Sequence, residues 1–174
     1  MAITILGVDP GLTRCGFGVI TAQGNRVSFV EAGVIRTPAD APIEDRLIAV
    51  WSALGELMDR HTPDAVSVER VYAQANVRTV MGTAQVSGLA LALAALRGVE
   101  VSTYTPTEMK AAVTGSGRAD KAQVTTMVQR LLKLDAPVKP ADASDALGLA
   151  ICHCWRGAAK ARIAAAAAKT GATR

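Results

Sequence analysis

The chain has 174 residues, half of them apolar, which is enough for one domain with a buried core and hardly enough for two. Three cysteines, an odd number without a secretory signal, argue against a disulfide framework, and we expect a cytoplasmic protein. The net charge of +4 divides into −4 over residues 1–69 (5 basic, 9 acidic) and +8 over residues 70–174 (14 basic, 6 acidic), and the basic part suggests a polyanionic partner such as nucleic acid.

The first third of the chain predicts mainly strands. Residues 3–9 form a nearly continuous apolar run, as in a buried strand, and residues 14–22 and 26–37 follow around the turn residues 23–25. These three segments predict an antiparallel meander. Apolar residues then recur every three or four positions and predict a helix with one buried face: Ile43, Leu47, Val50, Leu54 and Leu57. Residues 65–69 predict a short buried strand that ends on a carboxylate.

An uncharged segment between Arg78 and Arg97 predicts a long apolar helix over about residues 76–97. Its length is borderline for a membrane span, but threonine, glutamine and serine side chains dilute it. We therefore expect a helix buried in a core or in a dimer interface. Its small residues permit close approach by a partner helix: Gly82, Ala84, Ser87 and Gly88.

The second half continues the alternation of strands and helices. A strand over residues 99–105 precedes a short helix that opens at Thr105 and Pro106. Asp120 is the expected N-cap of a helix over residues 121–134, and the last helix begins at about Asp142. The whole pattern predicts an α/β fold with one mixed sheet over residues 1–156, followed by an Ala-rich basic tail, 157–174, that we expect to fray.

Acidic residues fall where sites form in such folds, at strand ends and helix starts. Asp9 ends the first strand, Glu69 ends the fourth, and Asp142 and Asp145 lie on one turn of the last helix. At a separation of about 5 Å, each pair of carboxylates would repel by roughly 3 kcal/mol, far more than the helix dipole returns. A convergent cluster therefore predicts a bound cation, and oxygen ligands suit Mg²⁺ or Mn²⁺. Two such ions can clamp a phosphodiester for attack by water.

Other catalytic patterns are absent or badly placed. His61 follows a helix end and is expected to be exposed, and His153 lies about 16 Å along the last helix from Asp142. The sequence contains neither a nucleophile-elbow motif nor a phosphate-binding Walker motif. A serine hydrolase and a P-loop enzyme are therefore disfavoured.

Five blocks of the chain together resemble the RuvC family of crossover (Holliday) junction endodeoxyribonucleases. They are GVDPGLTRCGFGVI (7–20), VERVY (68–72), VSGLALA (86–92), YTPTEMKAAVTGSGRADKAQV (104–124) and ADASDALGLAICH (141–153). All five occur in the family's order over about residues 3–156. The resemblance implies a ribonuclease-H-like fold, with a mixed five-stranded sheet flanked by helices.

The resemblance also implies an activity and its partners. The family acts as a homodimer that makes two symmetric nicks in a four-way DNA junction, leaving 5′-phosphate and 3′-hydroxyl ends, and works with the branch-migration proteins RuvA and RuvB. The catalytic and metal-binding acids by motif match are Asp9, Glu69, Asp142 and Asp145. Mg²⁺ is the expected cofactor, with two ions per site and Mn²⁺ as a substitute.

DNA contacts are assigned on the same resemblance. Tyr72 matches an aromatic position near the crossover and could stack on a base, although a core aromatic is the alternative. Lys110 and Lys121 match positions linked to activity, with solvated surface charges as the alternative. Arg78 and Arg118 are further candidates for contacts with the DNA backbone.

Three other functions fit the sequence less well. A sugar kinase or actin-like ATPase needs two domains around its nucleotide, and 174 residues are too few. A purely structural basic protein does not explain where the acids fall. A junction-binding module without catalysis is the main alternative, and retention of all four acids argues against it.

Overall fold

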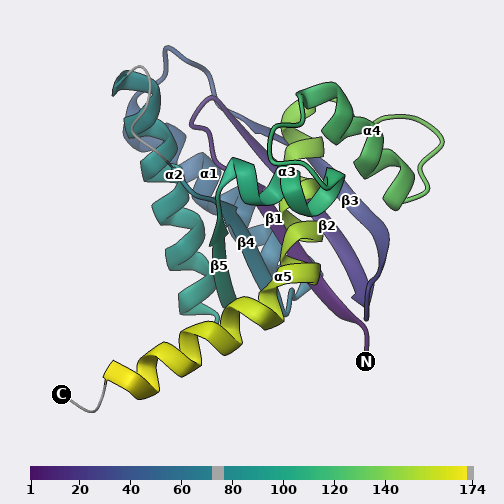
Figure 1. Cartoon of the computed structure of the whole chain (residues 1–174). Coiled ribbons are helices and arrows are strands. Elements are labelled where there is room, and N and C mark those ends of the chain that lie inside the picture. Colours follow the sequence, from purple (N-terminus) through teal and green to yellow (C-terminus); the bar gives the residue numbers. More distant parts are fainter. Residues whose placement is uncertain (72–76, 172–174) are drawn as a thin grey trace.

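The computed structural model of the chain describes residues 1–71 and 77–171. It contains five strands and five helices in the order β1 (Ile3–Asp9), β2 (Arg14–Gln23), β3 (Arg26–Arg36), α1 (Ile43–His61), β4 (Ala65–Glu69), α2 (Val77–Leu96), β5 (Glu100–Tyr104), α3 (Pro106–Thr114), α4 (Lys121–Leu131) and α5 (Ala141–Gly171). Figure 1 shows the sheet as the middle layer, with helices on both faces.

The five strands form one mixed sheet in the order β3-β2-β1-β4-β5. Strands β1, β2 and β3 pair antiparallel as the expected meander, and its turn is closed by Gly24 with a positive φ of 59°. Strands β4 and β5 add on the other side of β1 in parallel. The parallel strands β1, β4 and β5 therefore all end at the same edge of the sheet.

Two apolar cores lie on opposite faces of this sheet because side chains alternate along each strand. On one face α1 and α2 bury Leu6 and Val8. On the other face α3, α4 and α5 cover Ile5 and Ile20. This arrangement confirms the α/β class and the mixed five-stranded sheet flanked by helices.

Helix starts follow the expected capping chemistry. The Thr105 hydroxyl accepts a hydrogen bond from the Glu108 amide at 3.0 Å, and the Glu108 carboxylate accepts one from the Thr105 amide at 2.7 Å. Asp120 caps α4 in the same reciprocal way with Gln123. Both helices, which carry residues of the candidate site, therefore start where the sequence predicts.

Two expectations need correction. Helix α4 ends at Leu131 rather than at residue 134, because Lys133 adopts a left-handed conformation with φ of 53° and the Leu134 amide turns back to the Gln129 carbonyl. His61 is not exposed: its side chain is 14 % accessible and its Nε2 lies 2.6 Å from a carboxylate oxygen of Glu31. Its contact across to β3 was not visible in a sequence that places these residues 30 positions apart.

The structure tests the prediction for the apolar helix but not the predicted fraying of the tail. Among the helices that the structure describes, none is long and apolar enough to cross a membrane. Helix α2 instead buries Val86, Ala90 and Leu93 against α1 and the sheet. Helix α5 continues to Gly171 and therefore includes most of the tail, and fraying of residues 157–174 stays a prediction.

Candidate nuclease site

Two of the four acids are brought together by strand pairing. Val8 of β1 pairs with Val68 of β4 in parallel register, so Asp9 and Glu69 each follow at the same sheet edge. Strand β5 ends beside them at Tyr104, paired with Glu69. The carboxyl ends of parallel strands are a common place for sites in α/β folds.

Helix α5 delivers the other two acids because glycines let it lie directly on the sheet. A Cβ on Gly7 or Gly16 would overlap the backbone oxygens of Ala146 and Asp142, respectively. Gly16 also pairs with Asp9 in the β1–β2 ladder. Only residues without a side chain allow this approach, and it places the first turn of α5 over the end of β1.

Electrostatics indicate how close the acids are. Burial, followed by the charges of Glu69, Asp145 and Asp142, raises the pKa of Asp9 to about 8. Burial and the charge of Asp145 raise the pKa of Glu69, while Lys121 and Lys110 act in the opposite direction. Burial is also the largest cause of the raised pKa of Asp145. Half-buried carboxylates that disfavour one another's charge are typical of functional sites.

Two lysines lie near this cluster. The Nζ of Lys121, at the start of α4, is 3.7 Å from an oxygen of Asp145. Lys110 of α3 is half-buried, and its charge lowers the pKa values of both Glu69 and Asp145. The structure therefore brings Lys110 and Lys121 to the acids from separate helices.

Arg14 is a site residue that the sequence analysis missed. Its Nε and Nη2 both donate to Oδ2 of Asp142 at 2.7 Å. The only sequence signal was a basic residue shortly after Asp9, at the start of β2. The pairing joins residues 128 positions apart, and only the contact of α5 with the sheet reveals it.

The donor atoms suit a hard divalent cation, but they do not form a ready metal cage. Within residues 1–71 and 77–171, no three His, Cys, Asp or Glu side chains are grouped so that they could hold one metal ion. Asp142 faces Arg14 and Asp145 faces Lys121, so two of the acids are paired with cations. The four carboxylates nevertheless fit the chemistry of Mg²⁺ or Mn²⁺, because these ions prefer oxygen ligands of this type, and the pKa is raised in three of them: Asp9, Glu69 and Asp145.

Of the remaining sequence candidates for DNA contacts, the structure describes only the side chain of Arg118. Arg118 is exposed in the loop between α3 and α4, where it lines a hollow that Arg130 also lines. Tyr72 lies outside the described residues. Arg78 falls in the first turn of α2, and its side chain is among those that the structure does not describe. The roles of these three residues stay predictions.

Comparison with known proteins identifies the family. The family model for "Crossover junction endodeoxyribonuclease RuvC" matches residues 5–153. The chain belongs to the RuvC family. It is 63 % identical over 164 residues to the RuvC of Frankia alni, covering 94 % of this chain and 83 % of that protein. It is 57 % identical over 170 residues to the RuvC of Thermobifida fusca, covering 97 % of this chain and 93 % of that protein.

Solved RuvC structures agree with this assignment. RuvC of Thermus thermophilus in complex with a Holliday junction substrate superposes with a TM-score of 0.84 at 29 % identity, over 89 % of this chain and 94 % of that one. The yeast mitochondrial Holliday junction resolvase Ydc2 matches with a TM-score of 0.58 at 14 % identity, over 86 % of this chain and 78 % of that one, which is a likeness of fold. The expected ribonuclease-H-like fold is thereby confirmed.

Proposed function

We propose that this RuvC-family chain cuts four-way DNA junctions by hydrolysis of phosphodiester bonds, with divalent metal ions held by Asp9, Glu69, Asp142 and Asp145. The observation that carries the proposal is the convergence of these acids at one sheet edge, where neighbouring charges and burial raise the pKa of Asp9 to about 8. A bound cation removes the cost of ionising such a cluster.

The chemistry divides between the cations and the side chains. When bound, Mg²⁺ or Mn²⁺ would lower the pKa of a coordinated water and stabilise the charge that develops on the phosphate. Asp9 and Glu69, fixed by strand ends, would hold the ions in place. Asp142 and Asp145, on a helix packed against the sheet, would complete the ligand set once they leave Arg14 and Lys121.

The lysines have a second role in this proposal. Lys110 and Lys121 approach the acids from α3 and α4, so their charges lie where the phosphate of a bound strand would meet the metal site. Lysine acts as a point charge toward phosphate. We assign both to orienting the scissile strand and to balancing the acids before it binds.

We also propose a twofold dimer formed through α2, because a twofold assembly matches the symmetry of a junction cut at two equivalent sites. From Met81 to Ala95, helix α2 has an exposed face without charged residues and with mostly small side chains: Met81, Ala84, Gly88, Ala92 and Ala95. Nothing lies within 4 Å of a Cβ placed on Gly88, so the helix backbone is open to a neighbour there.

Sedimentation at micromolar concentration tests the dimer. Gly88→Arg should shift the protein to monomer, because a charged side chain would enter the interface. Ser52→Arg, at an exposed position of α1, is the matched control and should remain dimeric. A Gly88→Arg protein that sediments as a dimer would contradict the assigned face.

Cleavage of a synthetic four-way junction tests the activity. With Mg²⁺ the wild type should give paired nicks at symmetric positions and ends that ligase can seal, while EDTA or a linear duplex should give none. Tight junction binding without any nicking, with Mg²⁺ or Mn²⁺, would favour the non-catalytic binding module instead. Partnership with RuvA and RuvB, the number of metal ions and a cytoplasmic location stay predictions from the family resemblance.

A further inference from the structure

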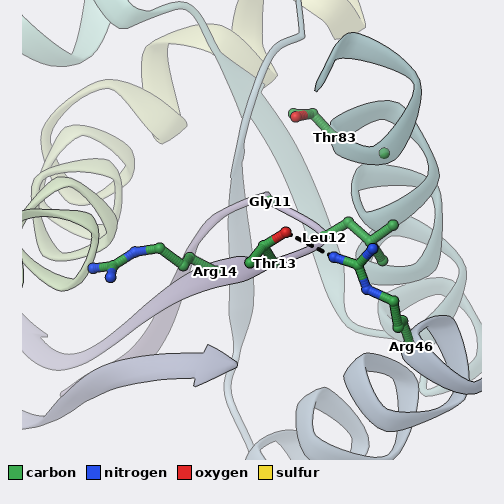
Figure 2. A pocket seen from close by; sticks show the side chains of 7 residues that line it. Gly11, Leu12, Thr13, Arg14, Arg46 and Thr83 are labelled. Carbon is green, nitrogen blue, oxygen red and sulfur yellow. Dashed lines mark hydrogen bonds between the residues drawn. The ribbon is translucent and has the colours of Figure 1, made fainter. Parts of the chain in front are cut away.

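A pocket lies beside the acid cluster, on the other side of the β1–β2 loop. It has a volume of about 360 Å³ and is lined by Gly11, Leu12, Thr13, Arg14, Arg46, Gly82 and Thr83. The loop residues follow Asp9 directly, α1 supplies Arg46 and α2 supplies the remaining two. Figure 2 shows the Arg46 guanidinium turned toward the Thr13 hydroxyl and joined to it by a hydrogen bond, while the Arg14 side chain leaves the loop in the opposite direction.

Arg46 is held firmly in this pocket by neutral acceptors. Its Nε donates to the Thr37 hydroxyl at 2.9 Å and its Nη2 to the Thr13 hydroxyl at 2.7 Å, with a longer contact of 3.4 Å from Nη1 to the Ala39 carbonyl. The Thr37 hydroxyl in turn donates to the Leu12 carbonyl. The guanidinium and the loop therefore support each other, and the arginine is fixed before any ligand arrives.

The charge of Arg46 is not neutralised within the part of the chain that the structure describes. None of its contacts there is a carboxylate, and none of the seven residues lining the pocket is acidic. Of the five N–H groups of a guanidinium, three have acceptors, so two stay available. A half-buried, preorganised cation in a concave pocket with hydroxyl groups is suited to a phosphate.

We propose that this pocket binds a backbone phosphate of the junction DNA, on the strand that also enters the acid site. The inference rests on the proposed function, since it takes its ligand from the substrate of the acid cluster. The shared β1–β2 loop links the two sites: Asp9 precedes the loop and Thr13 lies in it. A phosphate held by Arg46 and Thr13 would fix the position of the strand relative to Asp9.

A charge placed in the pocket tests this without replacing Arg46. Thr83→Glu adds a carboxylate at the pocket wall, and Thr83→Gln has nearly the same size and no charge. Binding of a fluorescent four-way junction is measured in EDTA at several salt concentrations. Thr83→Glu should bind the junction about tenfold more weakly than Thr83→Gln. The slope of log affinity against log salt concentration should also be smaller for Thr83→Glu, by about one phosphate contact.

If the two Thr83 variants bind the junction equally, within about twofold, the pocket does not bind a DNA phosphate. The proposed function is unaffected by that result as long as the wild type prefers the junction to a linear duplex. A wild type without that preference would overturn the proposed function, and this inference with it. The same assay therefore separates the two failures.

Chemical neutralisation of single DNA linkages locates the phosphate. Junctions with one methylphosphonate at successive positions near the crossover are titrated with wild type and with Arg46→Gln, after thermal melts have shown both to be folded. At one linkage the methylphosphonate should weaken junction binding by the wild type about tenfold and leave the affinity of Arg46→Gln for the junction unchanged. If every linkage affects both proteins equally, Arg46 contacts no phosphate and the proposal is wrong.

Discussion

The two ends of the sheet differ in how their acidic and basic side chains are balanced. At the carboxyl ends of the parallel strands, the acid edge (Asp9, Glu69, Asp142, Asp145) has more acids than nearby cations, and burial and repulsion raise the pKa of Asp9 to about 8. At the other end, the paired end (Glu31, Asp59, Arg60, His61, Arg97) gives its acids basic partners. There a hydrogen bond from Arg97 at 2.8 Å holds the pKa of Asp59 below its usual value.

The difference separates what holds the fold from what performs the chemistry. The two arginine pairs of the paired end, Arg60–Glu31 and Arg97–Asp59, are partly exposed ion pairs that join α1 to β3 and to α2. The acid edge instead keeps carboxylates in half-buried positions that are unfavourable without a cation. A protein selected for stability alone would not retain that arrangement. Four matched experiments test the contrast.

Cleavage should separate the two ends most strongly. Asp9→Asn removes a proposed metal ligand at the centre of the acid edge and should reduce junction cleavage by more than about a hundredfold, because loss of a direct ligand costs more than the roughly 10–100-fold lost with an outer-shell partner. Asp59→Asn makes the same chemical change at the paired end and should leave the rate within about twofold. Rates under single-turnover conditions with Mg²⁺ measure both. An active Asp9→Asn protein would remove Asp9 from the metal site.

The second largest effect is expected in how the free energy of unfolding depends on pH. A carboxyl whose pKa is about 8 in the folded protein and 3.8 when unfolded takes up a proton on folding at any pH between these values. Its contribution to the free energy of unfolding is therefore complete below about pH 4 and is lost as the pH rises toward 8. In metal-free buffer, the free energy of unfolding of wild type relative to Asp9→Asn should fall by about 1.4 kcal/mol per pH unit in that window. Urea titrations at pH 5, 6 and 7 measure it. A difference that does not vary with pH would mean that Asp9 ionises normally.

Most of the fold and the convergence of the four acids could be predicted from the sequence. Apolar runs, the Gly24 turn and the caps at Thr105 and Asp120 are local signals, and the structure follows them. The acids could be grouped because each stands at a strand end or helix start, where topology brings such positions together.

What the sequence could not supply were contacts between segments far apart in the chain. The pairing of Arg14 with Asp142 spans 128 positions, and that of His61 with Glu31 spans 30. Both depend on which faces of the helices meet the sheet. Gly7 and Gly16 fall within predicted strands, and only the packed structure shows that they let α5 lie against the sheet. Local patterns locate the elements, whereas side-chain partners need the packing.

Glycine substitutions probe the packing of the two ends. Gly16→Ala would push a methyl group into the backbone of α5 at Asp142, so we expect a loss of about 2 kcal/mol in the free energy of unfolding and slower cleavage. Gly55→Ala, within α1 near Arg97, meets only side-chain ends at 3.4 Å or more and should stabilise by about 0.5–1 kcal/mol. Urea unfolding measures both. A neutral Gly16→Ala would show that α5 can shift without affecting the acids.

The smallest effect is expected from the arginines that face an acid at each end. Arg14 and Asp142 are partly exposed, at 41 % and 26 % of their side-chain surface, so their attraction is modest. Because Arg14 occupies Oδ2 of Asp142, a metal ion that uses this oxygen must compete with the guanidinium. Arg14→Gln should therefore raise the affinity for Mn²⁺ about threefold, because the free energy of an exposed ion pair corresponds to a change of about that size. Arg97→Gln, which removes the partner of Asp59 instead, should leave the affinity for Mn²⁺ unchanged.

Calorimetric titration with Mn²⁺ in the absence of DNA reads this out without relying on cleavage. A rise in affinity in Arg14→Gln alone means that Arg14 acts as a substitute cation that the metal displaces. A fall in affinity would mean the reverse, that the guanidinium holds Asp142 in the orientation that the metal requires. Asp142 would then be preorganised by its partner on β2, and the acid edge would resemble the paired end more closely than its pKa values indicate.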